Sequence, residues 1–250
     1  MTKPLVLLVD DVPELGILVA SLGKRAGYTT ICRFDVPSAW DYLREERPDL
    51  ILLDVHLPGE EGLDLCRRVR ATPNLADLRI ALFSHWGLPA DIAAGLDAGV
   101  DFLVSKDLVS RPGEWRSRLD EILPAEHGRR RNHSLEWKLD TNPTPVPSSW
   151  VATLNHALDQ PCWRKIDGEV LRRMLRRALR HARPGADAHD WIGPDGWSLR
   201  TEQETPRDIA IALVAYLAEQ VWRLLGTEAS KPYWRVLASV VPGQPETVPG

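Results

Sequence analysis

The N-terminal half of the chain alternates short apolar runs with longer amphipathic stretches, five times in succession. Leu5–Val9 and Leu50–Leu53 contain no polar residue, so strands formed by them would be buried on both faces. Such strands belong to parallel sheets covered by helices, with right-handed crossovers. The pattern predicts a doubly wound α/β domain, with strands at Leu5–Val9, Thr29–Phe34, Leu50–Leu53, Ile80–Phe83 and Phe102–Val104 and helices at Leu15–Ala26, Ser38–Glu46, Leu63–Arg70, Pro89–Ala98 and Pro112–Leu123.

The chain has 250 residues, more than the roughly 100 to 150 of a common single domain, so two domains are expected. After the last apolar run comes a segment with a basic run and with prolines at positions 143, 145 and 147, which favour extended chain. Helical periodicity follows at Trp150–Leu158, Glu169–Arg183, Arg207–Leu225 and Pro232–Ser239. We therefore predict an α/β domain at 1–124, a linker at 125–149, a mainly α-helical domain at 150–241 and a flexible tail at 242–250.

The distribution of charged, apolar and cysteine residues indicates which classes of protein this chain can belong to. Residues 1–125 hold 14 Lys and Arg against 20 Asp and Glu, whereas residues 126–250 hold 17 against 15, so neither half is strongly basic. No apolar run reaches the roughly 18 residues that span a bilayer, and three acidic residues lie within the first 20. The three cysteines form no Cys-x-x-Cys pair and are expected to be reduced. These features favour a cytoplasmic protein without a membrane contact.

Polar residues follow the predicted strands at their carboxyl ends. Asp10 and Asp11 follow the first strand and Asp54 follows the third, so a parallel sheet would bring three carboxylates to one edge. Such a cluster needs a cation, and hard oxygen ligands suit Mg²⁺. Ser84 and Lys106 follow the fourth and fifth strands. The set fits phosphoryl transfer: Asp54 attacks phosphorus, while Lys106 and Ser84 receive the phosphoryl oxygens.

These residues resemble the receiver domain of bacterial two-component response regulators. The resemblance covers residues 1–124 and rests on Leu5–Asp11, Leu50–Gly62, Ser84 and Ser105–Lys106, with intervals of 30 residues from Asp54 to Ser84 and 22 from Ser84 to Lys106. It implies a flavodoxin-like sheet of order 2-1-3-4-5 and phosphorylation of Asp54 by a sensor histidine kinase or a phosphotransfer protein. It also implies Mg²⁺ held by Asp11, Asp54 and the His56 backbone carbonyl, with Asp10 acting through water.

Some positions depart from the family pattern. His85 and Trp86 stand after Ser84, where a small residue is usual, and Asp107 stands where proline is usual. Phe102 and Leu103 occupy the region of the family's aromatic switch residue, so the switch is expected to differ. Two alternatives to a phosphorylated site stay open. The carboxylates could be helix caps and turn residues beside a solvated lysine, or the domain could be an unphosphorylated pseudo-receiver.

A basic amphipathic helix is predicted at 169–183, with arginines opposite its apolar residues. The basic residues are Arg172, Arg173, Arg176, Arg177 and Arg180. They could contact nucleic acid, an acidic protein surface or only solvent. The next predicted helix is too distant for a helix-turn-helix motif. We favour a response regulator whose phosphorylation controls the helical domain through protein interaction or homodimerisation, without an enzymatic signature in that domain. The alternative is a DNA-binding transcription regulator that uses this helix.

Overall fold

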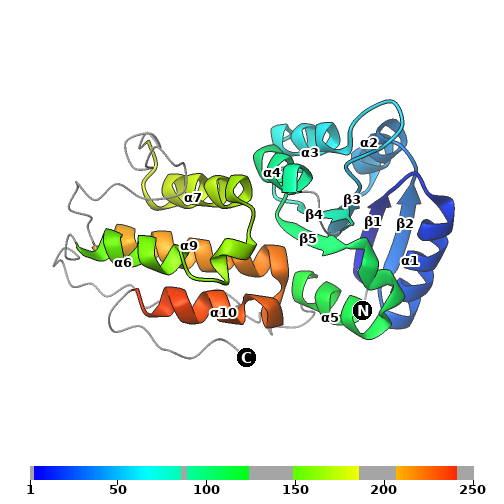
Figure 1. Ribbon diagram of the computed structural model, residues 1–250. Helices are drawn as coiled ribbons and strands as arrows, with labels where there is room; N and C mark the ends of the chain where they lie inside the picture. Colours follow the sequence, from blue (N-terminus) through cyan, green and yellow to red (C-terminus); the bar gives the residue numbers. More distant parts are fainter. Residues whose placement is uncertain (1–2, 86–88, 124–148, 186–206, 241–250) are drawn as a thin grey trace. The chain divides into compact units, whose positions relative to one another are not determined.

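The computed structural model describes residues 3–85, 89–123, 149–185 and 207–240 (Figure 1). The chain forms two compact units, residues 1–131 and 132–250. The predicted tail at 242–250 lies outside the described residues, as does the predicted linker apart from Ser149. The domain limits at 124 and 150 therefore stay predictions.

The N-terminal unit contains a parallel sheet of five strands in the order β2-β1-β3-β4-β5, which confirms the predicted fold. The strands are β1 (Leu5–Val9), β2 (Thr29–Arg33), β3 (Leu50–Leu53), β4 (Arg79–Ser84) and β5 (Phe102–Ser105). β1 and β3 pair with neighbours on both sides, and all four residues of β3 are buried, as expected for apolar runs in the middle of a parallel sheet.

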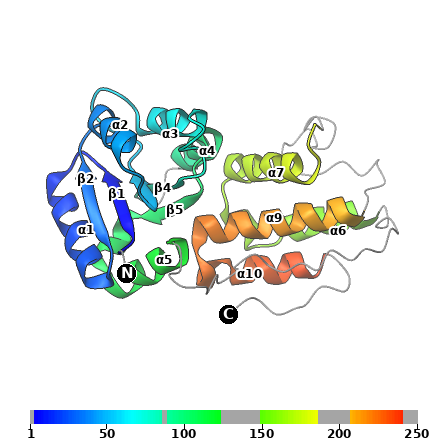
Figure 2. The same ribbon diagram turned by 180° about the vertical axis from the view of Figure 1, so that it is seen from behind.

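Helices connect the strands and cover both faces of the sheet (Figures 1 and 2). α1 and α5 pack together on one face, while α2, α3 and α4 follow one another on the other. Asp35 accepts the Ser38 N–H at 2.7 Å and so caps α2. Their bounds are α1 (Pro13–Ala26), α2 (Val36–Glu45), α3 (Gly62–Ala71), α4 (Pro89–Ala98) and α5 (Pro112–Ile122), with a short 3-10 helix, η1 (Lys106–Ser110), after β5.

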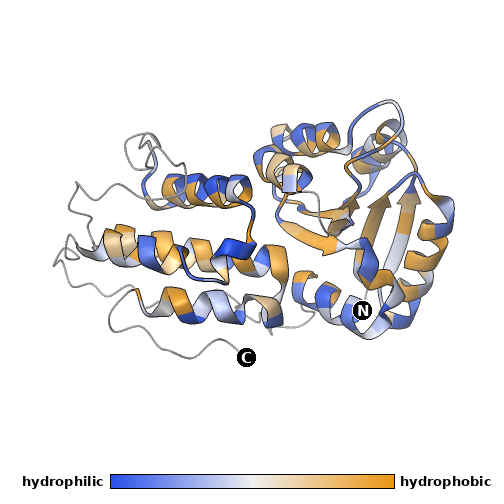
Figure 3. Cartoon of the chain, viewed as in Figure 1, coloured by the Kyte–Doolittle hydropathy of each residue, from blue (hydrophilic) through white to orange (hydrophobic). Residues whose placement is uncertain are grey.

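The core of this unit lies between the sheet and its helices, and Figure 3 shows apolar residues concentrated on the strands. Val6 to Val9 are fully buried. Phe83 on β4 packs edge-to-face on Trp115 of α5, with ring centroids 5.9 Å apart. Trp115 Nε1 donates a hydrogen bond to the Tyr28 hydroxyl, and burial raises the pKa of Tyr28 to about 12. These contacts fix α5 against the sheet.

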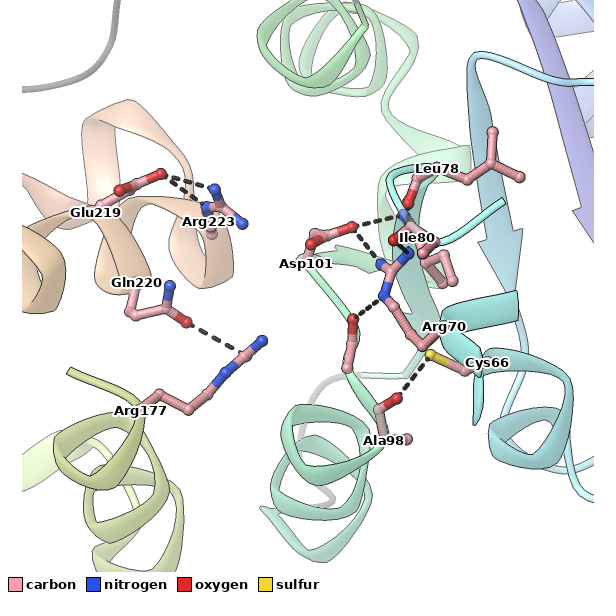
Figure 4. Close-up of polar contacts among 12 residues, drawn as sticks. Cys66, Arg70, Leu78, Ile80, Ala98, Asp101, Arg177, Glu219, Gln220 and Arg223 are labelled. Atoms are coloured by element: carbon pink, nitrogen blue, oxygen red, sulfur yellow. Dashed lines mark hydrogen bonds and ion pairs between the residues drawn. The ribbon is translucent and has the colours of Figure 1, made fainter. Parts of the chain in front are cut away.

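Arg70, near the end of α3, ties together the edge of the sheet opposite the carboxyl ends (Figure 4). Its guanidinium donates to the backbone carbonyls of Gly99, Ala76 and Leu78 at 2.9, 2.9 and 2.7 Å. It also pairs with Asp101 at 2.6 Å. Because Asp101 in turn accepts the Ile80 N–H at 2.9 Å, one side chain links α3, β4 and the turn between α4 and β5.

The C-terminal unit is helical, as predicted. It contains α6 (Ser149–Leu158), η2 (Trp163–Lys165), α7 (Gly168–Ala182), α9 (Arg207–Leu225) and α10 (Thr227–Ala238). Trp163, Trp234 and Leu175 are almost completely buried in its core. α10 begins five residues before the predicted start at Pro232. The proline lies inside the helix and not at the first position, where proline is favoured. No helix in the described ranges is long and apolar enough to cross a bilayer.

Candidate functional site

The sheet register brings the predicted site residues to one edge. Val9 pairs with Leu53 and Leu53 with Leu82, so Asp10 and Asp54 emerge side by side from the ends of β1 and β3. The Asp54 N–H donates to the Val9 carbonyl at 2.9 Å, which fixes this alignment. Ser84 and Ser105 pair at the ends of β4 and β5, directly before His85 and Lys106. The polar residues that follow four strands therefore meet at one edge.

Three carboxylates form a cluster there. One oxygen each of Asp10, Asp11 and Asp54 lies within 4.8 Å of the others, and the cluster is the only such group of acids in the described residues. Asp10 and Asp54 are buried, whereas Asp11 is exposed. The Asp10 carboxylate also accepts the Val12 N–H at 3.0 Å. This bond is the one observation that supports the alternative in which the carboxylates only cap a helix. That alternative does not explain why Asp54, from another strand, lies beside Asp10 and Asp11.

Lys106 lies between the two buried carboxylates. Its Nζ is 2.7 Å from Asp10 Oδ2 and 2.5 Å from Asp54 Oδ2, and its side chain is only 10% exposed. Burial by itself lowers the pKa of Lys106, but hydrogen bonds and charge attraction from both carboxylates outweigh it and raise this pKa. The lysine is therefore a positive charge fixed inside the site and not a solvated surface group.

Ser84 and His56 complete the edge. Ser84 is buried, and its hydroxyl lies 3.4 Å from the His85 carbonyl oxygen. The His56 N–H lies 3.4 Å from Asp54 Oδ1, and its ring nitrogen Nε2 lies 3.3 Å from Asp91 Oδ2 on α4. These contacts involve the N–H and the ring of His56 and not its carbonyl. The predicted role of the carbonyl therefore stays a prediction.

Gly62 is a site residue that our sequence prediction did not single out. A Cβ atom at this position would lie 1.8 Å from the Asp54 carbonyl oxygen, far inside van der Waals contact. The Gly62 N–H donates to the Val55 carbonyl at 2.8 Å, which keeps the start of α3 close to the end of β3. In the sequence, the only available sign of this role was a glycine a few residues after Asp54. The close approach of Gly62 to Asp54 depends on the path of the loop between them, which the sequence pattern does not give.

The departures from the family pattern lie in the loops beside the site. His85 Nδ1 is 3.2 Å from Asp107 Oδ1, so the two unusual residues contact each other. Both side chains are exposed, and Trp86 lies outside the described residues. The proposed switch residues Phe102 and Leu103 are buried in β5. The Leu103 carbonyl accepts a hydrogen bond from the buried Arg118 at 2.9 Å, and so has a fixed polar contact.

The arginines of α7 do not form a site of the same kind. Arg180 is exposed, and Arg172, Arg173, Arg176 and Arg177 are half-buried. Arg173 pairs with Glu169 one turn earlier at 2.6 Å. Arg177 lies 3.4 Å from the Gln220 side-chain oxygen on α9 (Figure 4). The predicted amphipathic helix is confirmed, but part of its basic face is already engaged within the helical unit.

Comparison with known proteins gives the family of the N-terminal unit. A family model for the response regulator receiver domain matches residues 6–114. Solved structures similar to the chain include a protein of Chloroflexus aurantiacus described as a response regulator, with 28% identity over 48% of this chain and 98% of that chain and a TM-score of 0.46. The Mn(2+)-bound form of response regulator Rcp1 has 24% identity, coverage of 49% and 100%, and a TM-score of 0.44. Chemotaxis response regulator CheY4 of Vibrio cholerae has 21% identity, coverage of 46% and 99%, and a TM-score of 0.41. The match to the family model identifies residues 6–114 as a response regulator receiver domain.

Proposed function

We propose that this chain is a response regulator in which Asp54 accepts a phosphoryl group from a sensor histidine kinase or a phosphotransfer protein. The observation that carries the proposal is the convergence of Asp10, Asp11 and Asp54 within 4.8 Å, with the Lys106 ammonium 2.7 Å from Asp10 and 2.5 Å from Asp54. Groups from three strands meet at the edge where parallel sheets place their reactive residues. The receiver identity of residues 6–114 supports signalling by phosphotransfer.

The proposed reaction uses a carboxylate oxygen of Asp54 as nucleophile. The Asp54 O–P bond forms while the P–N bond of the donor phosphohistidine breaks, and the imidazole nitrogen keeps the electron pair of that bond. Water later attacks phosphorus, the P–O bond to Asp54 breaks, and the carboxylate and inorganic phosphate are released. Asp54 is buried but keeps 7% of its surface exposed, and we propose that a donor reaches it there while bulk water is mostly excluded.

Lys106 and Ser84 are proposed to bind the phosphoryl oxygens. The Lys106 ammonium is fixed by two carboxylates and has a raised pKa, so it stays positively charged where negative charge develops. Ser84 adds a hydroxyl donor from the neighbouring strand. In the unphosphorylated site the ammonium contacts Asp54 itself, so phosphorylation would exchange this ion pair for one with the phosphoryl group.

The carboxylate cluster fits a divalent cation, with Mg²⁺ as our proposal. Three carboxylates oppose one ammonium, which leaves the ionised site with an excess of negative charge. Asp11 and Asp54 would bind the ion with the His56 carbonyl, and Asp10 would support it through water. When bound, the ion neutralises charge on the phosphoryl oxygens.

The helical unit is proposed to be the output, controlled through a protein interaction or homodimerisation and not through its own catalysis. Phosphorylation at Asp54 can select one state of the chain only if the modified site favours that state. DNA binding through α7 is the alternative, and the five arginines on one helix favour it. Their half-burial and their contacts with Glu169 and Gln220 favour the protein interaction.

Intact-mass and size-exclusion measurements test the proposal, with the natural chain compared with Asp54→Asn. With Mg²⁺ and acetyl phosphate, we expect the mass to rise by one phosphoryl group in the natural chain alone. With beryllium fluoride, we expect a change in assembly that also requires Asp54. A natural chain that gains no mass and keeps its elution volume would overturn the proposal and favour a pseudo-receiver.

A further inference from the structure

His56 contacts both Asp54 and α4. Its backbone N–H lies 3.4 Å from Asp54 Oδ1, and its ring nitrogen Nε2 lies 3.3 Å from Asp91 Oδ2. Asp91 is in the first turn of α4, which begins at Pro89. A single residue thus joins the side chain of the proposed phosphoacceptor to the start of a helix on another part of the sheet.

Asp91 is the more buried partner of this contact. Its side chain is 15% exposed, whereas that of His56 is 66% exposed. Asp91 Oδ2 is shielded from solvent and makes no well-aligned hydrogen bond in the described part of the chain. Because a buried carboxylate oxygen is costly without a donor, the nearby imidazole N–H is the group placed to satisfy it. The more buried carboxylate is therefore the side of this contact that restrains the exposed His56 ring.

The C-terminal end of α4 is tied to α3. The Cys66 thiol lies 3.3 Å from the carbonyl of Ala98, the last residue of α4, and Arg70 Nε donates to the Gly99 carbonyl at 2.9 Å. Both partners come from α3. With its C-terminal end tied to α3, α4 can respond to a change at Asp54 most readily at its N-terminal end, where Asp91 lies.

We propose that Asp91 is a positioning residue for phosphoryl transfer: through the His56 ring it holds the His56 N–H against Asp54 Oδ1 and so orients the carboxylate. This inference rests on the proposed function of Asp54. The coupling is reciprocal, because a free energy that links two sites acts in both directions. A phosphoryl group on Asp54 would shift His56 and loosen the start of α4, and a partner bound to α4 would alter the rate of transfer.

The test compares Asp91→Ala and Asp91→Asn with Asp97→Ala, which removes the exposed acid of the same helix. In the unphosphorylated protein, hydrogen exchange of the His56 amide is measured by NMR. We expect Asp91→Ala to speed this exchange at least about fivefold, while Asp91→Asn stays close to the natural chain because its amide oxygen keeps an acceptor beside the imidazole. Asp97→Ala should leave the exchange unchanged.

A second readout is the initial rate of Asp54 phosphorylation over a range of acetyl phosphate concentrations with Mg²⁺. Asp91→Ala should lower the maximal rate and leave the half-saturating concentration near its natural value, since a positioning defect acts on transfer and not on donor binding. Asp91→Asn should restore most of the rate. In the double variant with His56→Ala, the loss should not exceed that of the larger single variant.

Unchanged His56 exchange in Asp91→Ala would overturn the inference, as would additive losses in the double variant. These outcomes leave the proposed function intact, provided that the natural chain gains a phosphoryl group and Asp54→Asn does not. If the natural chain gains none, the proposed function fails instead, and the amide exchange still decides whether Asp91 holds His56. Melting temperatures of all variants identify any that fail to fold.

Discussion

The two units of this protein distribute their charged side chains in different ways. In the receiver domain, Asp10, Asp54 and Lys106 come from three separate strand ends, and the Lys106 ammonium lies 2.7 Å from Asp10 and 2.5 Å from Asp54. In the helical unit, short ion pairs such as those between Glu169 and Arg173 and between Glu228 and Lys231 lie within single helices. Each of these pairs joins residues three or four apart and at least one partner is well exposed.

The difference separates groups proposed to perform chemistry from groups that stabilise a helix. Pairs one turn apart form as soon as the helix forms and contribute only about 0.2–0.5 kcal/mol each. Charges from distant segments are costly to bury together and persist where a site needs them. The convergence at the receiver edge therefore predicts function, whereas the arginines of α7 alone do not.

Gly62→Ala should damage the convergent site most. Its added Cβ would lie 1.8 Å from the Asp54 carbonyl oxygen, so the backbone beneath the acidic cluster must move. We expect a loss of about 3 kcal/mol in the free energy of unfolding and loss of phosphorylation by acetyl phosphate. Urea unfolding and intact mass measure both effects.

Gly113→Ala is the matched control in the same domain, because a Cβ there meets no atom within 4 Å. It lies in the first turn of α5, where alanine should be neutral or stabilise by up to about 1 kcal/mol. If Gly62→Ala unfolds and is phosphorylated like this control, then the close packing of α3 on Asp54 does not support the site.

These two glycines also show what the sequence could and could not predict. The sheet and the positions of Asp10, Asp54 and Lys106 followed from apolar runs and from the residue after each run, because strand pairing then determines which ends meet. Gly62 and the His56–Asp91 contact depend on loop paths and on the placement of α4, which periodicity does not encode. Periodicity likewise marked the basic face of α7, but not which arginines would be covered.

Lys106→Met should have the next largest effect. Removing the ammonium leaves Asp10 and Asp54 facing each other without their shared counter-charge. We expect a loss on the order of 2 kcal/mol at neutral pH with chelator, below the full cost for a deeply buried pair because the site is partly accessible. Added Mg²⁺ should recover much of this loss by neutralising the carboxylates.

Lys231→Met provides the corresponding change in the helical unit, since Lys231 pairs with Glu228 at 2.5 Å within one turn of α10. Its effect should stay below about 0.5 kcal/mol and should not respond to Mg²⁺. Equal losses for the two lysine variants in urea unfolding would remove the energetic distinction between the convergent site and the pairs within helices.

Replacing Arg172, Arg176 and Arg180 on α7 with Gln should have the smallest effect. Since these arginines lie on a helix face and not in a convergent site, we expect each change to cost less than about 0.5 kcal/mol and the chain to bind no duplex DNA near physiological salt. Fluorescence anisotropy with labelled duplex, with and without beryllium fluoride, measures binding as salt is varied.

The control variant removes the same charge from exposed ion pairs of the receiver, through Arg44→Gln, Arg67→Gln and Arg116→Gln. Salt-dependent binding that the α7 variant loses and this control keeps would make α7 a functional surface, and the contrast between the two units would then fail.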